Sequence, residues 1–323
     1  MSSSVSVVIP AKNAASELTR CLEGLRTQAI KPNIYVADGK STDDTVEVAQ
    51  RYGCHVFTLD TSPTIRRNVA SFTTPDEVLA FIDSDCIPDA HWLENGLHYF
   101  ADHSIGAVVG PNLTRSDTPL KARITGDVLA SRFGGGIAYE RYRQTHDHFT
   151  DERSAILANM LVRRSVFSRI GGFYRWFGGE ENDLINRIGE AGFRIVYSRD
   201  VVVYHVRVPL FLPYMRQIFL YARGRGLLFR LRGVANPFYL LPTIFALGEI
   251  VLLFALPTLG LVLFGLYGMM ASVASLQIVT RYKENRTKAF FYLLPAFLLT
   301  HVTYALGLLY GFAKPNPGRK RAR

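Results

Sequence analysis

Two long apolar runs in the last third of the chain set the first limit on its fold. Residues 237–280 are almost wholly apolar, interrupted by Pro242, Glu249 and Pro257, and residues 289–312 form a second run. The first run is too long for one crossing of a hydrocarbon core about 30 Å thick. Dividing it near Pro257 predicts three membrane spans in a region of residues 237–313, near residues 238–256, 258–280 and 289–312.

Charge is distributed unevenly along the chain. Residues 1–205 hold 22 Lys+Arg and 25 Asp+Glu, whereas residues 206–323 hold 15 and 2. The basic surplus therefore accompanies the apolar runs, which indicates membrane flanks and excludes nucleic acid as the partner. The loop 281–288 and the N-terminal part are expected in the cytoplasm. A third span would place the basic tail 314–323 outside, so the last run is re-entrant, the first is not a hairpin, or the positive-inside tendency fails here.

The stretch between Arg207 and Arg232 contains six arginines and no acids. Its apolar residues recur at helical spacing, which predicts an amphipathic helix at the membrane interface within residues 206–236. The alternative is a solvated basic face. Because guanidinium groups match phosphate geometry, Arg223 and Arg225 are candidates for contact with the membrane or with the pyrophosphate of a lipid-linked acceptor.

The start of the chain and its cysteines point to the cytoplasm. Met1-Ser-Ser-Ser leads directly into the first strand pattern, so we expect the catalytic part to face the cytoplasm on a multi-pass cytoplasmic membrane protein. Cys21, Cys54 and Cys86 are unclustered, which suits a reducing compartment and ordinary packing.

Residues 1–205 alternate between strand and helix patterns. Such alternation predicts an α/β domain with a mainly parallel, Rossmann-like sheet covered by helices on both faces. Ligands of such sheets bind beyond the carboxyl ends of the strands. The expected strands are residues 5–9, 33–37, 55–59 and 78–82, and the expected helices are residues 16–27, 42–52 and 65–71.

Polar clusters follow three of these strands, at residues 10–13, 38–43 and 83–85. Asp83 and Asp85 come after an apolar strand, and a divalent cation bound also by substrate phosphates would explain two acids there. Ser41 and Asp44 resemble a capping box, which leaves Asp38 to accept a hydrogen bond from a base or ribose, or to form the turn.

Another acidic cluster, residues 180–183, opens a helical pattern. The macrodipole alone favours acids in a first helical turn. However, Trp176 and Phe177 precede the cluster, and an apolar wall beside a carboxylate raises its pKa toward that of a general base. Trp176 is equally a candidate for stacking on a sugar or for a core position.

Taken together, these motifs resemble those of family 2 glycosyltransferases with the GT-A fold. The resemblance covers roughly residues 3–230, and the membrane tail is most similar to enzymes of bacterial or archaeal cell-surface polysaccharides, including the succinoglycan type. It rests on residues 6–13 (Ser-Val-Val-Ile-Pro-Ala-Lys-Asn), 36–43 (Val-Ala-Asp-Gly-Lys-Ser-Thr-Asp), Asp83-Ser-Asp85, Gly171-Gly-Phe and residues 179–184 (Gly-Glu-Glu-Asn-Asp-Leu).

The resemblance implies roles for individual residues. Asp85 would bind Mg²⁺ or Mn²⁺, with Asp83 on the ribose or sugar side and His205, which ends a strand pattern, as a further ligand or a structural residue. Glu181 would be the general base, standing where the family commonly has Asp, with Glu180 as support and Asp183 as the alternative. Nucleotide contacts would come from Pro10, Ala11, Asn13, Asp38, Arg67 and Asp83.

The resemblance also implies an activity. It is inverting, metal-dependent transfer of a sugar, of the hexosyltransferase type, from a nucleotide-diphospho-sugar to a lipid-linked or polysaccharide acceptor. Two alternatives stay open. One is transfer to a polyprenyl phosphate, and the other is a non-catalytic nucleotide-binding membrane scaffold of a polysaccharide assembly.

Overall fold

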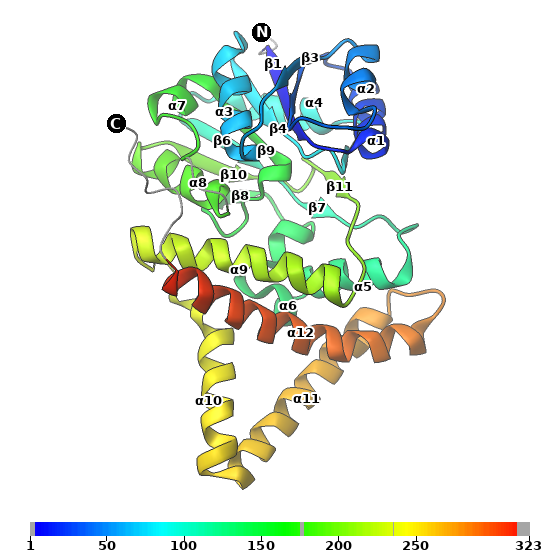
Figure 1. The fold of residues 1–323 in the computed structure, drawn as a ribbon, viewed down its shortest axis with the longest axis vertical. Helices are drawn as coiled ribbons and strands as arrows, with labels where there is room; N and C mark the ends of the chain where they lie inside the picture. The colour runs from blue at the N-terminus through cyan, green and yellow to red at the C-terminus, as the bar shows by residue number, and fades with distance from the viewer. Residues whose placement is uncertain (1–3, 175–177, 235, 315–323) are drawn as a thin grey trace. The chain divides into compact units, whose positions relative to one another are not determined.

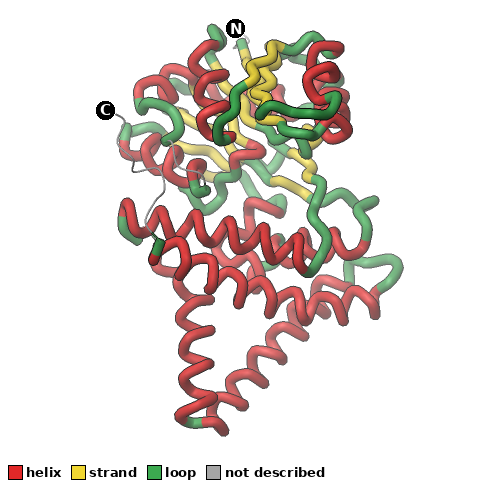
Figure 2. The backbone as a smooth tube through the Cα atoms, viewed as in Figure 1, coloured by secondary structure: helices red, strands yellow, loops and turns green. Residues whose placement is uncertain are grey.

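The computed structural model describes residues 4–174, 178–234 and 236–314. The chain divides into two compact units. The first comprises residues 1–113 and 140–206, and the second comprises residues 114–139 and 207–323. The boundaries expected from the sequence, at residues 205 and 236, did not group residues 114–139 with the C-terminal helices. Figure 2 shows the strands of the first unit and the helices and loops that make up the second.

The first unit is built on an eight-stranded sheet with the order β3-β2-β1-β4-β9-β6-β10-β8 (Figure 1). β1 pairs in parallel with β2 and β4, β2 with β3, and β6 with β10, whereas β9 and β8 are antiparallel to their neighbours. A smaller sheet has the order β5-β11-β7. The strands are β1 (Val5–Ala11), β2 (Asn33–Asp38), β3 (His55–Thr58), β4 (Val78–Phe81), β5 (Cys86–Pro88), β6 (Ile105–Val109), β7 (Asn112–Leu113), β8 (His148–Thr150), β9 (Met160–Arg163), β10 (Arg194–Tyr197) and β11 (Val203–His205).

Alternating side chains divide the core of this unit between the two faces of the large sheet. Val7 and Ile9 pack against α1, α2 and α4, whereas Val8 belongs to the cluster under α3, α7 and α8. The predicted mainly parallel sheet with helices on both faces is therefore confirmed. The helices are α1 (Ala15–Arg26), α2 (Thr45–Arg51), α3 (Pro63–Thr73), α4 (Trp92–Leu97), α7 (Arg164–Arg169) and α8 (Glu180–Glu190), with the 3₁₀ turns η1 (His98–Ala101) and η3 (Leu157–Asn159).

The second unit is helical in the part of it that the structure describes. Three of its helices are long and apolar enough to cross a membrane, over residues Pro237–Ala255, Pro257–Val279 and Arg286–Ala313. These helices coincide with the three apolar segments near residues 238–256, 258–280 and 289–312. The helices are α5 (Leu120–Leu129), α6 (Arg132–Gly135), α9 (Leu212–Arg232), α10 (Leu241–Ala255), α11 (Pro257–Val279) and α12 (Arg286–Ala313), with η4 (Pro237–Leu240), while η2 (Gly136–Tyr142) lies at the unit boundary.

Candidate active site

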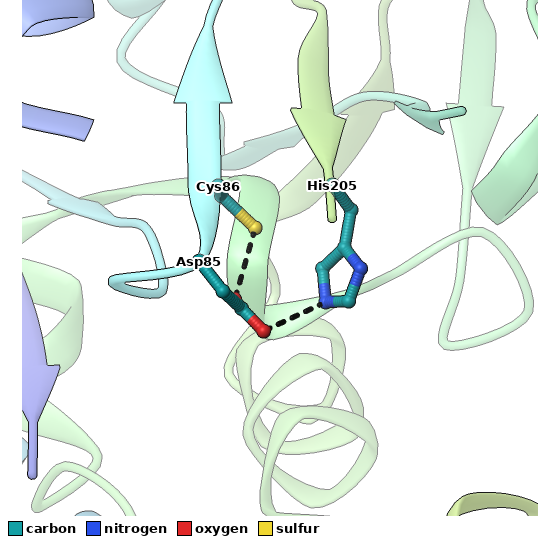
Figure 3. Close-up of side chains that lie close together, drawn as sticks. All are labelled: Asp85, Cys86 and His205. Atoms are coloured by element: carbon teal, nitrogen blue, oxygen red, sulfur yellow. Dashed lines mark hydrogen bonds and ion pairs between the residues drawn. The ribbon is translucent and has the colours of Figure 1, made fainter. Parts of the chain in front are cut away.

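Three possible metal ligands converge where β5 and β11 pair. His205 lies directly opposite Cys86 in this antiparallel pair, so both side chains point to the same face of the small sheet. Asp85 immediately precedes β5, and its carbonyl accepts a hydrogen bond from the backbone N–H of Val206. Figure 3 shows the three side chains pointing toward one another, with His205 Nε2 3.4 Å from Asp85 Oδ2.

This cluster suits a divalent cation. One donor atom from each of Asp85, Cys86 and His205 lies within 4.8 Å of the others. The His205 side chain is buried, whereas the Asp85 side chain is 41% exposed. A carboxylate with an imidazole is a donor set that Mn²⁺ accepts, whereas Mg²⁺ usually keeps water and oxygen ligands. The residues present therefore fit a metal.

Cys86 is a member of this cluster that the sequence did not reveal. Its spacing from other cysteines carries no metal signature, so ordinary packing was the expectation. Its thiol is buried and lies 3.6 Å from Asp85 Oδ1. Cys86 joins Asp85 and His205 because of the register between β5 and β11. The sequence signals this register only through the strand pattern of residues 201–205, which ends at His205.

Asp83 turns to a different partner from Asp85. Arg67 Nη2, on α3, donates to Asp83 Oδ1 at 2.5 Å, and Arg67 Nη1 lies 3.9 Å from Glu180 Oε1. Both Arg67 and Glu180 are buried. The Arg67 guanidinium therefore connects the acidic loop after β4 with the first turn of α8. It brings Glu180, expected to support the general base, close to Arg67 and Asp83, both expected at the nucleotide.

The three acids in the first turn of α8 have different environments. Burial, and then the nearby Glu181, raise the pKa of Glu180, which accepts hydrogen bonds from the Gly178 backbone at 2.6 Å and from the Thr64 hydroxyl at 3.2 Å. Asp183 is fully buried and accepts a 2.8 Å hydrogen bond from Arg187. Because an acceptor hydroxyl cannot reach a carboxylate enclosed in this way, these contacts favour structural roles for Glu180 and Asp183.

Glu181 is the most exposed of these three acids. Its side chain is 19% exposed, and its Oε1 accepts a 3.0 Å hydrogen bond from Asn182 and lies 3.8 Å from Arg141 Nη1. Arg141 is itself fixed, because it donates to Asn182 Oδ1 at 2.6 Å and to two backbone carbonyls of residues 152–153. Glu181 is thus oriented without being enclosed, as a general base requires.

The candidate nucleotide side lies at the carboxyl ends of β1 and β2. Ala11 and Asp38 are register partners there. Asp38 is buried and accepts hydrogen bonds from the Ser41 backbone and hydroxyl, which is the geometry of a turn-forming aspartate. Asn13 joins the same turn, since its side chain accepts a 2.8 Å hydrogen bond from the Thr42 backbone. Pro10 precedes this edge within β1.

The capping-box interpretation of Ser41 and Asp44 is wrong. The helix α2 begins at Thr45, and the side chain of Asp44 makes no capping hydrogen bond. The physical reason is that the Ser41 hydroxyl is engaged by Asp38 at 2.5 Å. Asp43 instead accepts from the Thr45 hydroxyl, a contact that lowers the pKa of Asp43.

Arg66 is a second residue that sequence reasoning missed. Its guanidinium donates to the carbonyls of Ala11 at 2.5 Å and Ala37 at 2.8 Å, and so ties the ends of β1 and β2 together. A Cβ at Gly39 would lie 2.6 Å from Arg66 Nη1, so a glycine there leaves room for this contact. The helical spacing of α3 alone does not reveal that adjacent arginines serve two different loops.

Three candidates remain, Trp176, Arg223 and Arg225. Trp176 lies outside the described residues. Arg223 and Arg225 are on α9, in the second unit, where Arg225 is buried and stacks on Tyr239 at 3.9 Å. That stacking gives Arg225 a packing role within its own unit.

Comparison with known proteins decides the family. Residues 6–171 match the model of glycosyl transferase family 2. The chain belongs to glycosyltransferase family 2. It is 26% identical over 221 residues to the glycosyltransferase AglE of Haloferax volcanii, covering 64% of this chain and 67% of that protein. It is 31% identical over 241 residues to the succinoglycan biosynthesis protein ExoA of Rhizobium meliloti, covering 70% of each.

The fold of this family 2 glycosyltransferase is also found among solved structures. The mannosyltransferase PcManGT from Pyrobaculum calidifontis, solved in complex with GDP-Man and Mn²⁺, superposes with a TM-score of 0.64 at 18% identity. The match covers 96% of this chain and 88% of that one. The chain is a glycosyltransferase with a GT-A fold that uses a nucleotide-sugar.

Proposed function

We propose that this glycosyltransferase is a metal-dependent, inverting enzyme of the hexosyltransferase type. It moves a sugar from a nucleotide-diphospho-sugar to a lipid-linked or polysaccharide acceptor at the cytoplasmic face of the membrane. The observation that carries the proposal is the pairing of two neighbouring acids with two different partners. Asp85 faces His205 at 3.4 Å, and Asp83 is held by Arg67, which also approaches the helix that carries Glu181.

Asp85 and His205 would hold the metal, with the Cys86 thiol beside them. A bound divalent cation would neutralise the negative charge that develops on the leaving nucleoside diphosphate. The imidazole in the donor set supports Mn²⁺ over Mg²⁺, as does the Mn²⁺ in the P. calidifontis mannosyltransferase. Arg67 orients Asp83 toward the donor side, where Pro10, Ala11, Asn13 and Asp38 shape the nucleotide edge.

Glu181 would take the proton from the acceptor hydroxyl as that hydroxyl attacks the anomeric carbon. The carbon–oxygen bond to the acceptor forms as the bond to the diphosphate breaks, so a single displacement inverts the anomeric configuration. Arg141 and Asn182 hold the Glu181 carboxylate in position. A carboxylate base within reach of the hydroxyl contributes a rate factor of about 10² to 10⁴.

The acceptor class and the cellular location rest on observations outside the site. The similarity to ExoA supports a cell-surface polysaccharide, and three helices able to cross a membrane support a membrane-bound acceptor. The surplus of 15 Lys+Arg over 2 Asp+Glu in residues 206–323 supports a cytoplasmic orientation of the flanks of these helices.

The test is nucleoside diphosphate release by detergent-purified protein with UDP-, GDP- and dTDP-sugars, in Mn²⁺ or Mg²⁺ and with membrane lipid extract as acceptor. We expect one donor to be consumed in Mn²⁺. Asp85→Asn and Glu181→Gln should each reduce turnover by at least about 10²-fold. Matched controls are Asp200→Asn and Glu190→Gln, which change exposed acids of the same unit.

Two outcomes would contradict the proposal. Full activity of Asp85→Asn would remove the metal role. Full activity of Glu181→Gln would remove the base and favour transfer to a polyprenyl phosphate, whose acceptor oxygen needs little deprotonation.

A further inference from the structure

The three apolar helices of the second unit are packed in two different ways. Only 17% of the α10 segment and 22% of the α11 segment are buried, and large apolar side chains such as Phe254, which is 87% exposed, cover them. For α12 the buried share is 39%. Figure 1 shows α10 and α11 as the two arms of a hairpin, whereas α12 runs beside α9. All three helices are long and apolar enough to cross a membrane, yet their environments differ.

Glycines bring α12 and α9 into close backbone contact. A Cβ at Gly311 would lie 2.0 Å from the Arg223 carbonyl, and one at Gly307 would lie 2.5 Å from the Phe219 carbonyl. The buried hydroxyls of Tyr214 and Thr300 are also hydrogen-bonded at 2.8 Å. Along both helices these contacts advance in the same direction, so the two helices run parallel and share one depth over about 14–17 Å, at 1.5 Å rise per residue.

The depth that they share is set by α9. This helix carries five arginines between residues 212 and 232. Placing an arginine at the centre of a membrane is strongly unfavourable. A helix with five of them stays at the interface, where guanidinium groups reach water and phosphate. Because α12 packs along α9, it stays there as well, and its exposed apolar residues, such as Phe291 and Leu306, face the lipid.

Both ends of the hairpin are anchored in the part of the unit that does not cross. At the start, Tyr239 is buried and Arg225 of α9 stacks on it at 3.9 Å. At the end, the Tyr282 hydroxyl donates a 2.6 Å hydrogen bond to Asp127 of α5, and Arg123 stacks on the Tyr282 ring at 4.0 Å. The hairpin thus begins next to a contact with α9 and ends next to a contact with α5, and both of these helices carry charged side chains.

The charge pattern agrees with a hairpin. None of the 15 Lys+Arg of residues 206–323 lies within residues 237–280. The one charged residue of that segment, Glu249, is buried and does not face lipid. At 1.5 Å per residue, the 23-residue segment spans about 34 Å, which exceeds a hydrocarbon core about 30 Å thick, and the 19-residue segment spans about 28 Å, which is close to it.

We propose that α10 and α11 alone cross the membrane, as a hairpin, and that α12 lies with α9 at the interface where the chain enters. The N-terminal unit, the loop 281–285 and the basic tail 314–323 are then on one side. All 15 Lys and Arg residues of residues 206–323 are then on the same side of the membrane, as the positive-inside tendency requires. Three spans would instead place the basic tail on the opposite side. The inference rests on the membrane attachment proposed above and is independent of the chemistry at Asp85 and Glu181.

The test is labelling of single cysteines with a membrane-impermeant maleimide in sealed right-side-out and inverted vesicles. Cys54 is first replaced by Ser, and the buried Cys21 and Cys86 are checked for lack of labelling in that background. The introduced cysteines are Glu23→Cys in the first unit, Thr258→Cys at the turn of the hairpin, Glu284→Cys in the loop and Arg319→Cys in the tail. Sugar transfer by each variant is measured separately.

We expect Glu23→Cys, Glu284→Cys and Arg319→Cys to be labelled in the same preparation and Thr258→Cys not to be labelled in it. Labelling of Arg319→Cys and Glu284→Cys from opposite faces would show that α12 crosses and would overturn the inference. Labelling of Thr258→Cys from the same face as Glu284→Cys would overturn the hairpin. Protein recovered outside the membrane fraction with sugar transfer intact would overturn the membrane attachment and leave the enzyme assignment standing.

Discussion

Arg67 in the first unit and Gly311 in the second both lie at contacts that bring distant segments together, but the two contacts use opposite chemistry. Arg67 is a buried charge between two carboxylates from different elements. Gly311 has no side chain, and its value is that the Arg223 carbonyl of α9 can approach it. The first unit thus joins these segments through a buried charge, whereas the second joins two helices through close backbone packing.

Arg67→Met should have the largest effect. It leaves the buried Glu180 and the partly exposed Asp83 without their shared cation, and breaking a buried pair costs about 3–5 kcal/mol. Because the Asp83 side chain is 34% exposed, we expect the lower end of that range. Chemical unfolding in detergent measures the loss. Arg20→Met, which removes an exposed arginine, is the control.

A double variant sharpens this prediction. Glu180→Gln in the Arg67→Met background removes one of the uncompensated charges, so it should recover part of the lost unfolding free energy. Additive losses in the double variant would show that Arg67 and Glu180 do not interact.

Gly311→Ala should have the next largest effect. The new Cβ would lie 2.0 Å from a backbone carbonyl of α9, so the helices must separate, and overpacking of this kind costs about 1–3 kcal/mol. The matched control is Gly265→Ala on α11, where a Cβ meets nothing within 4 Å. The melting temperatures of both variants are compared in the same detergent, and equal values would contradict the close contact between α9 and α12.

Tyr282→Phe tests the anchor at the end of the hairpin. It removes the 2.6 Å hydrogen bond to Asp127, a partly buried acid whose pKa is raised by its burial. Losing one hydrogen bond to a partly buried carboxylate costs about 1–2 kcal/mol. Tyr52→Phe, which removes a hydroxyl outside this pair, should change the melting temperature far less. A larger shift for Tyr52→Phe than for Tyr282→Phe would contradict an anchoring role of the Tyr282 hydroxyl.

The smallest expected effect is a pH dependence from Glu180. Burial raises its pKa in the folded state, so the folded protein binds the proton more tightly than the unfolded chain does. Its contribution to stability is complete below the unfolded value of about 4.3 and is lost as pH rises through the raised value. Between the unfolded pKa and the raised folded pKa, Glu180→Gln should flatten the slope of unfolding free energy against pH, whereas Glu190→Gln should leave this slope unchanged.

Much of the fold could be predicted from the sequence, because hydrophobic periodicity reports directly on local structure. The strands ending near Ala11, Asp38 and Phe81 follow from apolar runs bounded by polar turns, and the three long apolar helices follow from length and composition. These features depend on neighbours along the chain.

The rest depends on contacts between distant residues. The environment of Glu181 differs from that of Glu180 only because Arg67, Thr64 and Arg141 approach them from elsewhere. Cys86 joins Asp85 through the register of two short strands. The packing of α12 on α9 depends on glycines that have no signature in a hydropathy profile.

The measurement that tests the site most directly is Mn²⁺ binding, followed by electron paramagnetic resonance, in parallel with sugar transfer by the same preparations. We predict that Asp85→Asn and His205→Gln each weaken Mn²⁺ binding by about 10- to 100-fold. Glu181→Gln should bind Mn²⁺ as the wild-type protein does and yet lose transfer. Wild-type Mn²⁺ affinity in Asp85→Asn, or weakened affinity in Glu181→Gln, would contradict the division between a metal cluster at β5 and β11 and a base on α8.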